Sequence, residues 1–170
     1  GNFYNGGEAR TLGAEFFATI NIIKSIGLQS KLRLPITISY TYTNAEFLSS
    51  FESNFESWGD VYTGYEFPYL AKHQLSSRLS AHYKNFEFHL NSKYNSTMRA
   101  QAGDGEINSV ENIPAYLILD CAAKYHISEN ISVNLNIQNL TNKAYVVALR
   151  PAGLRPGLPR IIQFGINANL

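Results

Sequence analysis

Apolar and polar residues alternate along most of the chain, and a period of two is typical of β-strands with one apolar and one polar face. The clearest run is 115–127, where every odd position is apolar and the even positions include Asp120, Lys124 and His126. Six further segments alternate in the same way, at about residues 12–22, 32–42, 75–83, 86–94, 131–138 and 162–170. The pattern predicts an all-β protein with seven strands and no helix.

The expected links between these strands are alternately short and long. The short links are residues 24–29, 84–85 and 128–130, and the long ones are about 44–72, 99–114 and 143–159. Short and long links therefore fall at opposite ends of the predicted sheet. Antiparallel transmembrane β-barrels have this arrangement, with short periplasmic turns, long outer loops and aromatic residues near both membrane interfaces.

A two-residue hairpin at 84–85 fixes the pairing of its strands. It places Tyr83, Ala81 and Leu79 opposite Phe86, Phe88 and Leu90 on the apolar face, and His82 opposite Glu87 on the polar face. We expect the last pair to line a hydrated lumen. The hairpin thus predicts one continuous apolar face across two neighbouring strands.

A soluble β-sandwich or lipocalin-type barrel would also alternate, but its polar face would usually carry many Lys and Glu residues. Here that face holds mainly Ser, Thr, Asn and Gln, and charged residues make up only 16% of the chain. Lys plus Arg total 14 and Asp plus Glu total 13, a formal net charge of +1, which gives no electrostatic reason to expect a nucleic-acid partner. The longest apolar run, residues 144–149, is far shorter than the ~20 residues of a membrane-spanning helix.

Candidate chemistry is sparse. Cys121 is the single cysteine, and the four histidines lack the spacing of metal ligands. No nucleophile and base are placed at adjacent positions. We therefore expect no catalytic residues, no metal site and no cofactor.

Seven strands leave two unpaired edges, which are not tolerated in hydrocarbon. Either one strand is missing from the prediction and the chain is a small eight-stranded barrel, or it belongs to a larger barrel. The motifs favour the second reading. The segment 139–145 (NLTNKAY) and the run 150–160 (RPAGLRPGLPR) precede the last alternating strand. They closely resemble the C-terminal signature of TonB-dependent outer-membrane receptors, and the second run is most like the ferric-citrate type.

The residues that carry this resemblance are Asn139, Leu140, Asn142, Lys143, Tyr145, Pro156, Gly157, Pro159 and Arg160. From the residues themselves we expect structural roles. Proline and glycine stiffen and turn a link, Asn side chains cap backbone groups, and Arg160 anchors the loop to neighbouring carbonyls or carboxylates.

The resemblance implies a 22-stranded barrel filled by an N-terminal plug, in the outer membrane of a Gram-negative bacterium. Such receptors import iron chelates, including siderophores, with energy from the TonB complex. Residues 1–170 would then be one unit, the last seven strands, without the plug, the earlier strands or the TonB-contacting segment. Further implied partners are outer-membrane lipid and the barrel-assembly machinery, which reads an aromatic terminal residue where this sequence has Leu170.

Two arginines are candidate ligand-binding residues. Arg150 and Arg155 lie in the last long link, where guanidinium groups can hold an anionic chelate such as ferric citrate through paired charged hydrogen bonds. The link at 44–72 is acidic, with Glu46, Glu52, Glu56, Asp60 and Glu66. We expect it to repel an anion and to serve gating or partner contact instead.

Three functions remain open at this point: an energised iron-chelate receptor, a passive porin-like channel, and a small complete structural or adhesive barrel. A plug domain would distinguish the first from the other two.

Overall fold

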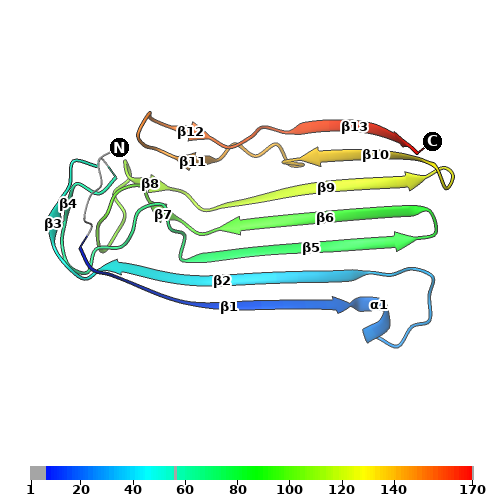
Figure 1. Cartoon of the computed structure of the whole chain (residues 1–170), viewed down its shortest axis with the longest axis horizontal. Coiled ribbons are helices and arrows are strands. Elements are labelled where there is room, and N and C mark those ends of the chain that lie inside the picture. Colours follow the sequence, from blue (N-terminus) through cyan, green and yellow to red (C-terminus); the bar gives the residue numbers. More distant parts are fainter. Residues whose placement is uncertain (1–6, 56, 170) are drawn as a thin grey trace.

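The computed structural model describes residues 7–55 and 57–169. Seven strands form one antiparallel sheet in the order β1-β2-β5-β6-β9-β10-β13 (Figure 1). They are β1 (Ala9–Asn21), β2 (Pro35–Phe47), β5 (His73–Tyr83), β6 (Phe86–Asn95), β9 (Tyr116–His126), β10 (Ile131–Gln138) and β13 (Ile161–Ala168). Each strand pairs with the next long strand of the chain, so the sheet is a meander. The predicted all-β fold and its seven strands are confirmed. Leu170, noted above in place of an aromatic terminal residue, lies outside the described residues.

The long links gather at one end of the sheet and the short turns at the other (Figure 1). We call these the link end and the turn end. Each long link contains a small two-stranded sheet. These pairs are β3 (Phe51–Glu52) with β4 (Asp60–Val61), β7 (Met98–Arg99) with β8 (Asn112–Ile113), and β11 (Val146–Ala148) with β12 (Arg155–Pro156).

The expectation of no helix was wrong at one place. The four-residue helix α1 (Ile22–Ser25) follows β1, and the Asn21 side chain caps it by accepting a hydrogen bond from the Lys24 backbone N–H at 3.4 Å. Asn is a strong helix cap, and alternation alone does not reveal such a cap. Among the described residues, no helix is long and apolar enough to cross a membrane.

The observed register confirms the predicted hairpin, with Tyr83 opposite Phe86 and His82 opposite Glu87. The same register continues across the sheet and keeps apolar residues together. One apolar row crosses all seven strands and consists of Ile20, Ile36, Leu79, Leu90, Cys121, Ile137 and Ile162. Because a one-residue slip would turn every side chain to the other face, this continuity fixes the register strongly.

Two serines interrupt the apolar face at neighbouring positions. Ser77 and Ser92 are opposite each other on β5 and β6, and their hydroxyl oxygens are 2.8 Å apart. Each hydroxyl therefore has a partner within the face. A polar pair that satisfies itself costs far less in an apolar environment than an isolated hydroxyl.

The buried side chains lie mainly at the link end. They include Phe47, Val61, Ala71, Met98, Ala100 and Ile113. In the sheet, by contrast, large apolar side chains such as Phe164 and Ile166 are about two-thirds exposed (70% and 66%). The links thus have a packed core of their own, while the sheet presents its apolar face outward.

Candidate functional site

Asn139 organises the corner that follows β10. It is 2% exposed and has a positive φ of 48°, a conformation that Asn adopts more readily than most residues. Its amide nitrogen donates to the carbonyls of Lys143 and Leu158, both at 2.9 Å, and its amide oxygen accepts from the Lys143 N–H. Its backbone N–H donates to Asp120 on β9 at 2.7 Å. One buried residue thus ties three segments together through its side chain and its backbone.

Tyr145 and Gly157 form the second part of this corner. The Gly157 N–H donates to the Tyr145 carbonyl at 2.9 Å, and the Tyr145 ring lies against the glycine. A Cβ atom at Gly157 would be 1.9 Å from that ring. The ring also packs on Tyr116, with centroids 4.8 Å apart. Only glycine leaves room for the ring in this position.

The remaining motif residues hold the chain on both sides of the corner. The Leu140 N–H donates to the Leu119 carbonyl at 2.7 Å, and Asn142 accepts a hydrogen bond from the Arg160 N–H at 3.0 Å. Pro156 pairs with Val146 in the β11–β12 hairpin, and Pro159 is exposed. The backbone of Arg160 is held by this bond to Asn142 and the residue is exposed, so the anchoring role expected for its side chain stays a prediction.

The two candidate arginines have different surroundings. The Arg150 side chain is 23% exposed and forms an ion pair with Glu111 at 2.5 Å. Its backbone N–H donates to the Tyr69 hydroxyl at 2.9 Å. Arg155 lies in β12 opposite Ala148 and is exposed. The β11–β12 hairpin therefore carries one exposed arginine, with a second, carboxylate-bound one just beyond β11.

The acidic link is partly compensated by nearby cations. Glu46 pairs with Arg10, and Glu66 pairs with Lys72 and Arg99. Glu52 and Asp60 are exposed and opposite each other in the β3–β4 hairpin. The predicted Glu56 lies outside the described residues. Negative charge is thus concentrated at the hairpin, and the base of the link is neutralised.

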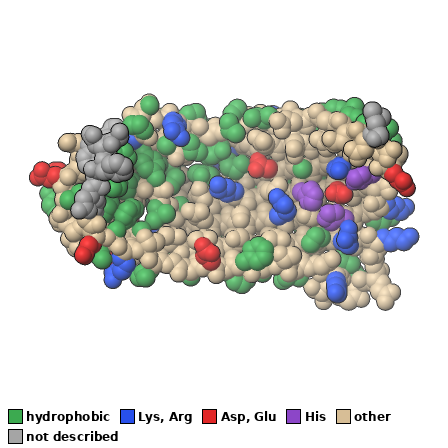
Figure 2. All heavy atoms as spheres, viewed as in Figure 1, with side chains coloured by type: hydrophobic (Ala, Val, Ile, Leu, Met, Phe, Trp, Pro, Cys, Tyr) green, Lys and Arg blue, Asp and Glu red, His purple; other side chains and the backbone are tan. Residues whose placement is uncertain are grey.

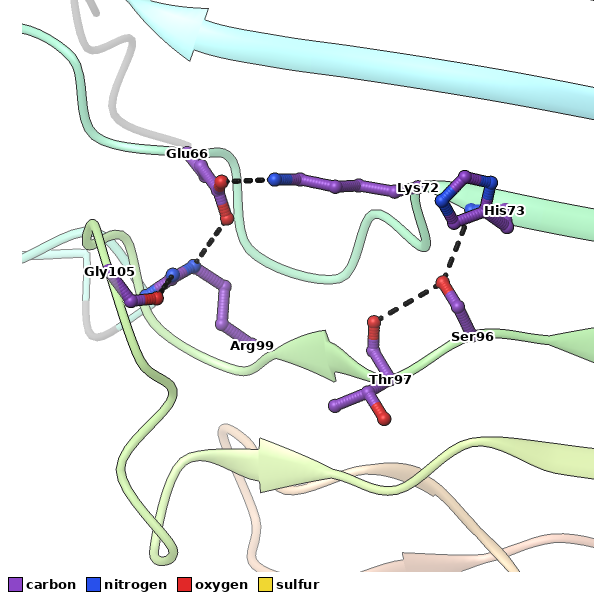
Figure 3. A network of polar contacts seen from close by, with 7 residues as sticks. All are labelled: Glu66, Lys72, His73, Ser96, Thr97, Arg99 and Gly105. Atoms are coloured by element: carbon purple, nitrogen blue, oxygen red, sulfur yellow. Dashed lines mark hydrogen bonds and ion pairs between the residues drawn. The ribbon is translucent and has the colours of Figure 1, made fainter.

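Glu66 is the centre of a network that Figure 3 shows from close by. Its carboxylate accepts hydrogen bonds from Lys72 and from Arg99, the latter at 3.1 Å, and Arg99 also donates to the Gly105 carbonyl at 3.0 Å. Burial raises the pKa of Glu66, but the hydrogen bonds and charges of Lys72 and Arg99 together outweigh burial and hold the pKa below its usual range. Glu66 is therefore held in its charged form.

The predicted lumen pair is correct in register but not in side-chain contact. Glu87 contacts His126, with 3.2 Å between the carboxylate oxygen and Nε2, whereas the His82 ring packs edge-on against His89 at 5.5 Å. Glu87 has a neighbouring strand on each side, and the contact forms with β9 instead of β5. Figure 2 shows histidines gathered toward the turn end. Within the described ranges, no group of three or more His, Cys, Asp or Glu residues could hold a metal ion.

Sequence reasoning missed a groove of about 510 Å³ on the polar side of the sheet. Its lining includes Phe17, Arg78, Asn91, Lys93 and Asp120. Arg78 donates to Asn91 at 2.7 Å, and Phe17 is 71% exposed. The sequence did contain an indication of this groove, because Phe17 is a large aromatic residue at an odd position of the alternating segment 12–22, where the other odd positions are polar or glycine. The groove combines two cations, the Asp120 carboxylate and one aromatic ring, and this lining suits a polar group.

Taken together, a seven-stranded meander, one apolar and one polar face, and long links at a single end define a section of a transmembrane β-barrel wall. Residues 1–140 match the family described as TonB dependent receptor-like, beta-barrel. The chain therefore belongs to this family, as the motifs suggested.

Solved structures show the same fold. The siderophore receptor PiuA from Acinetobacter baumannii superposes with a TM-score of 0.69 at 19% identity, over 95% of this chain and 22% of that one. The ferric citrate transporter FecA in its unliganded form superposes with a TM-score of 0.68 at 20% identity, over 95% of this chain and 24% of that one. The pyoverdine receptor FpvA from Pseudomonas aeruginosa superposes with a TM-score of 0.64 at 17% identity, over 95% of this chain and 22% of that one. The chain thus spans about a quarter of their length. A search of curated proteins gave no match.

Proposed function

We propose that this chain is part of an outer-membrane receptor of a Gram-negative bacterium that takes up iron chelates with energy from the TonB complex. Membership of the receptor family carries the proposal. This is a family of transport receptors rather than of enzymes. Structural neighbours described as a siderophore receptor and a ferric citrate transporter support an iron chelate as ligand.

In this proposal residues 1–170 are the C-terminal strands of the barrel. The apolar face contacts outer-membrane lipid, and the link end faces outward. The plug and the segment that contacts TonB belong to other parts of the receptor. The barrel-assembly machinery inserts the strands and pairs the edges that β1 and β13 leave open in the described sheet.

We further infer an anionic chelate of the ferric-citrate type, with Arg150 and Arg155 as capturing residues. Arg150 already holds a carboxylate: its Nη2 is 2.5 Å and its Nε 3.5 Å from the two oxygens of Glu111. A ligand carboxylate has the same shape and charge as that of Glu111 and can replace it there. Arg155 is exposed on the adjacent hairpin and would supply a second cation.

The test is ferric citrate binding by the full-length receptor, with Arg155→Ala and Arg150→Ala made singly and together. A charged hydrogen bond contributes ~1.5 to 3 kcal/mol, so each variant should bind about tenfold more weakly or worse. Lys84→Ala at the turn end is the matched control and should bind normally. Unchanged affinity in the double variant, with an intact barrel, would refute the capture role while leaving the receptor function standing.

A passive porin-like channel is the alternative, and the polar groove at Arg78 and Lys93 is compatible with it. The two functions differ in their energy requirement. Uptake of radioactive ferric citrate that stops when the TonB complex is deleted supports the receptor. Uptake that continues at the same rate supports the channel.

A further inference from the structure

The first two long links are residues 48–55 with 57–72, and residues 96–115. They are joined to each other by backbone hydrogen bonds. The Glu66 N–H donates to the Gly103 carbonyl at 2.8 Å, the Tyr69 N–H to the Arg99 carbonyl at 2.8 Å, and the Ala102 N–H to the Ser57 carbonyl at 3.0 Å. These bonds are spread along both links rather than confined to their bases. The two links are therefore bonded to each other and are not merely adjacent.

A buried arginine joins the same two links through side chains. Arg99 is 6% exposed and contacts both the Glu66 carboxylate of the first link and the Gly105 carbonyl of its own (Figure 3). Its guanidinium lies so close to Gly103 that a Cβ there would be 2.8 Å from Nη1. Removing one partner of a buried charge leaves the other uncompensated, so separating the links is costly.

An apolar core spans the same boundary. Ala71 of the first link packs with Met98, Ala100 and Ile113 of the second, all 8% exposed or less. Tyr69 packs against this core as well. Opening one link alone would expose this apolar surface to water.

The third link, between β10 and β13, is attached in a different way. Leu149 packs on the edge of the core, and Arg150 contacts both Tyr69 and Glu111. β11 contacts β8 of the second link as well, and its Ala148 is 8% exposed. Residues 151–156, beyond Arg150, are exposed.

We propose that the first two links form one rigid lid that moves as a single body, and that the third link is a clasp held on the lid by Arg150. Glu66 and Arg99 are the lock between the two halves of the lid. The lid does not depend on which ligand the receptor takes, because all of its contacts are within the chain. Any outward movement of one lid link must carry the other with it.

Hydrogen exchange followed by mass spectrometry on the intact receptor in detergent micelles tests this proposal. Glu66→Gln removes the charge at the lock, and we expect exchange in residues 57–69 and 99–105 to rise together, by about tenfold. Glu52→Gln, on the exposed β3–β4 hairpin, is the matched control and should leave both segments unchanged. Glu111→Gln should raise exchange around 146–156 and leave the lid protected. A rise confined to one of the two lid links would overturn the proposal.

A cross-link provides a second test that does not depend on a destabilised variant. Ser57→Cys and Ala102→Cys, with Cys121 replaced by Ser, place a cysteine on each half of the lid. The pair should oxidise readily, and exchange in both links should stay the same after oxidation because they already move together. A pair that fails to cross-link, or an oxidised lid that exchanges about tenfold more slowly than the reduced one, would show that the links separate.

Discussion

Tyr145 and Gly157 constrain each other across the last long link. The ring fills the space that any other side chain at residue 157 would need, and the glycine N–H is bonded to the tyrosine carbonyl. The residue types of this corner were recognisable in the sequence as a motif. The reason for them, a ring lying on a glycine, appears only when the two residues are seen together.

Gly157→Ala should destabilise this corner because the new methyl group displaces the Tyr145 ring. Overpacking of this kind costs ~1 to 3 kcal/mol. The measurement is hydrogen exchange at residues 139–160 in the full-length receptor.

A double-mutant cycle with Tyr145→Ala provides the control for this prediction. If the ring is the obstacle, Gly157→Ala should cost much less once the ring has been removed. An equal cost in both backgrounds would assign the effect to the backbone instead.

Glu66 makes the lid sensitive to acid. Its pKa is lowered in the folded protein, so its contribution to stability is complete above the ordinary value of 4.5 and is lost as the pH falls through the lowered pKa. We expect exchange in the lid to rise below pH 4.5, after correction for the intrinsic exchange rate. Glu66→Gln should abolish this pH dependence, and a variant that keeps it would contradict the assignment to Glu66.

Strands were predicted well because alternation depends on neighbouring residues alone. The register of β5 and β6 followed from a two-residue turn for the same reason. Two-residue strands such as β3 and β4 are too short to show a period, and α1 depends on one capping side chain. The partner of Arg150 is Glu111, 39 residues away, and no local pattern indicates such a pair.

The whole sheet has one apolar face and one polar face. The apolar row through Leu90, Cys121 and Ile137 runs without a break from β1 to β13. The self-paired Ser77 and Ser92 are compatible with an apolar environment. The opposite face carries the groove and the histidines His82, His89 and His126, which suits a hydrated interior.

Leu119→Arg should therefore impair the barrel far more than Asn136→Arg. Leu119 is on the apolar face of β9, and a cation near the middle of the membrane costs ~2 to 4 kcal/mol there. Asn136 is on the polar face of β10, beside Ala122 and Gln163. The check is heat-modifiable migration of the full-length receptor on unboiled gels, and equal loss in both variants would contradict the assignment of faces.

The meander has a consequence for the order of folding. Every pairing in the sheet joins strands that are consecutive among the seven, but only the hairpins with short turns begin with contacts that are local in the sequence, such as Tyr83 with Phe86. Local contacts form fast, and the entropy of closing a loop rises only slowly with its length. The β5–β6 and β9–β10 hairpins, with the shortest turns, are therefore the natural starting points, and the lid can close only after β2, β5, β6 and β9 stand side by side. The turn end sets the register early, and the link end is completed last.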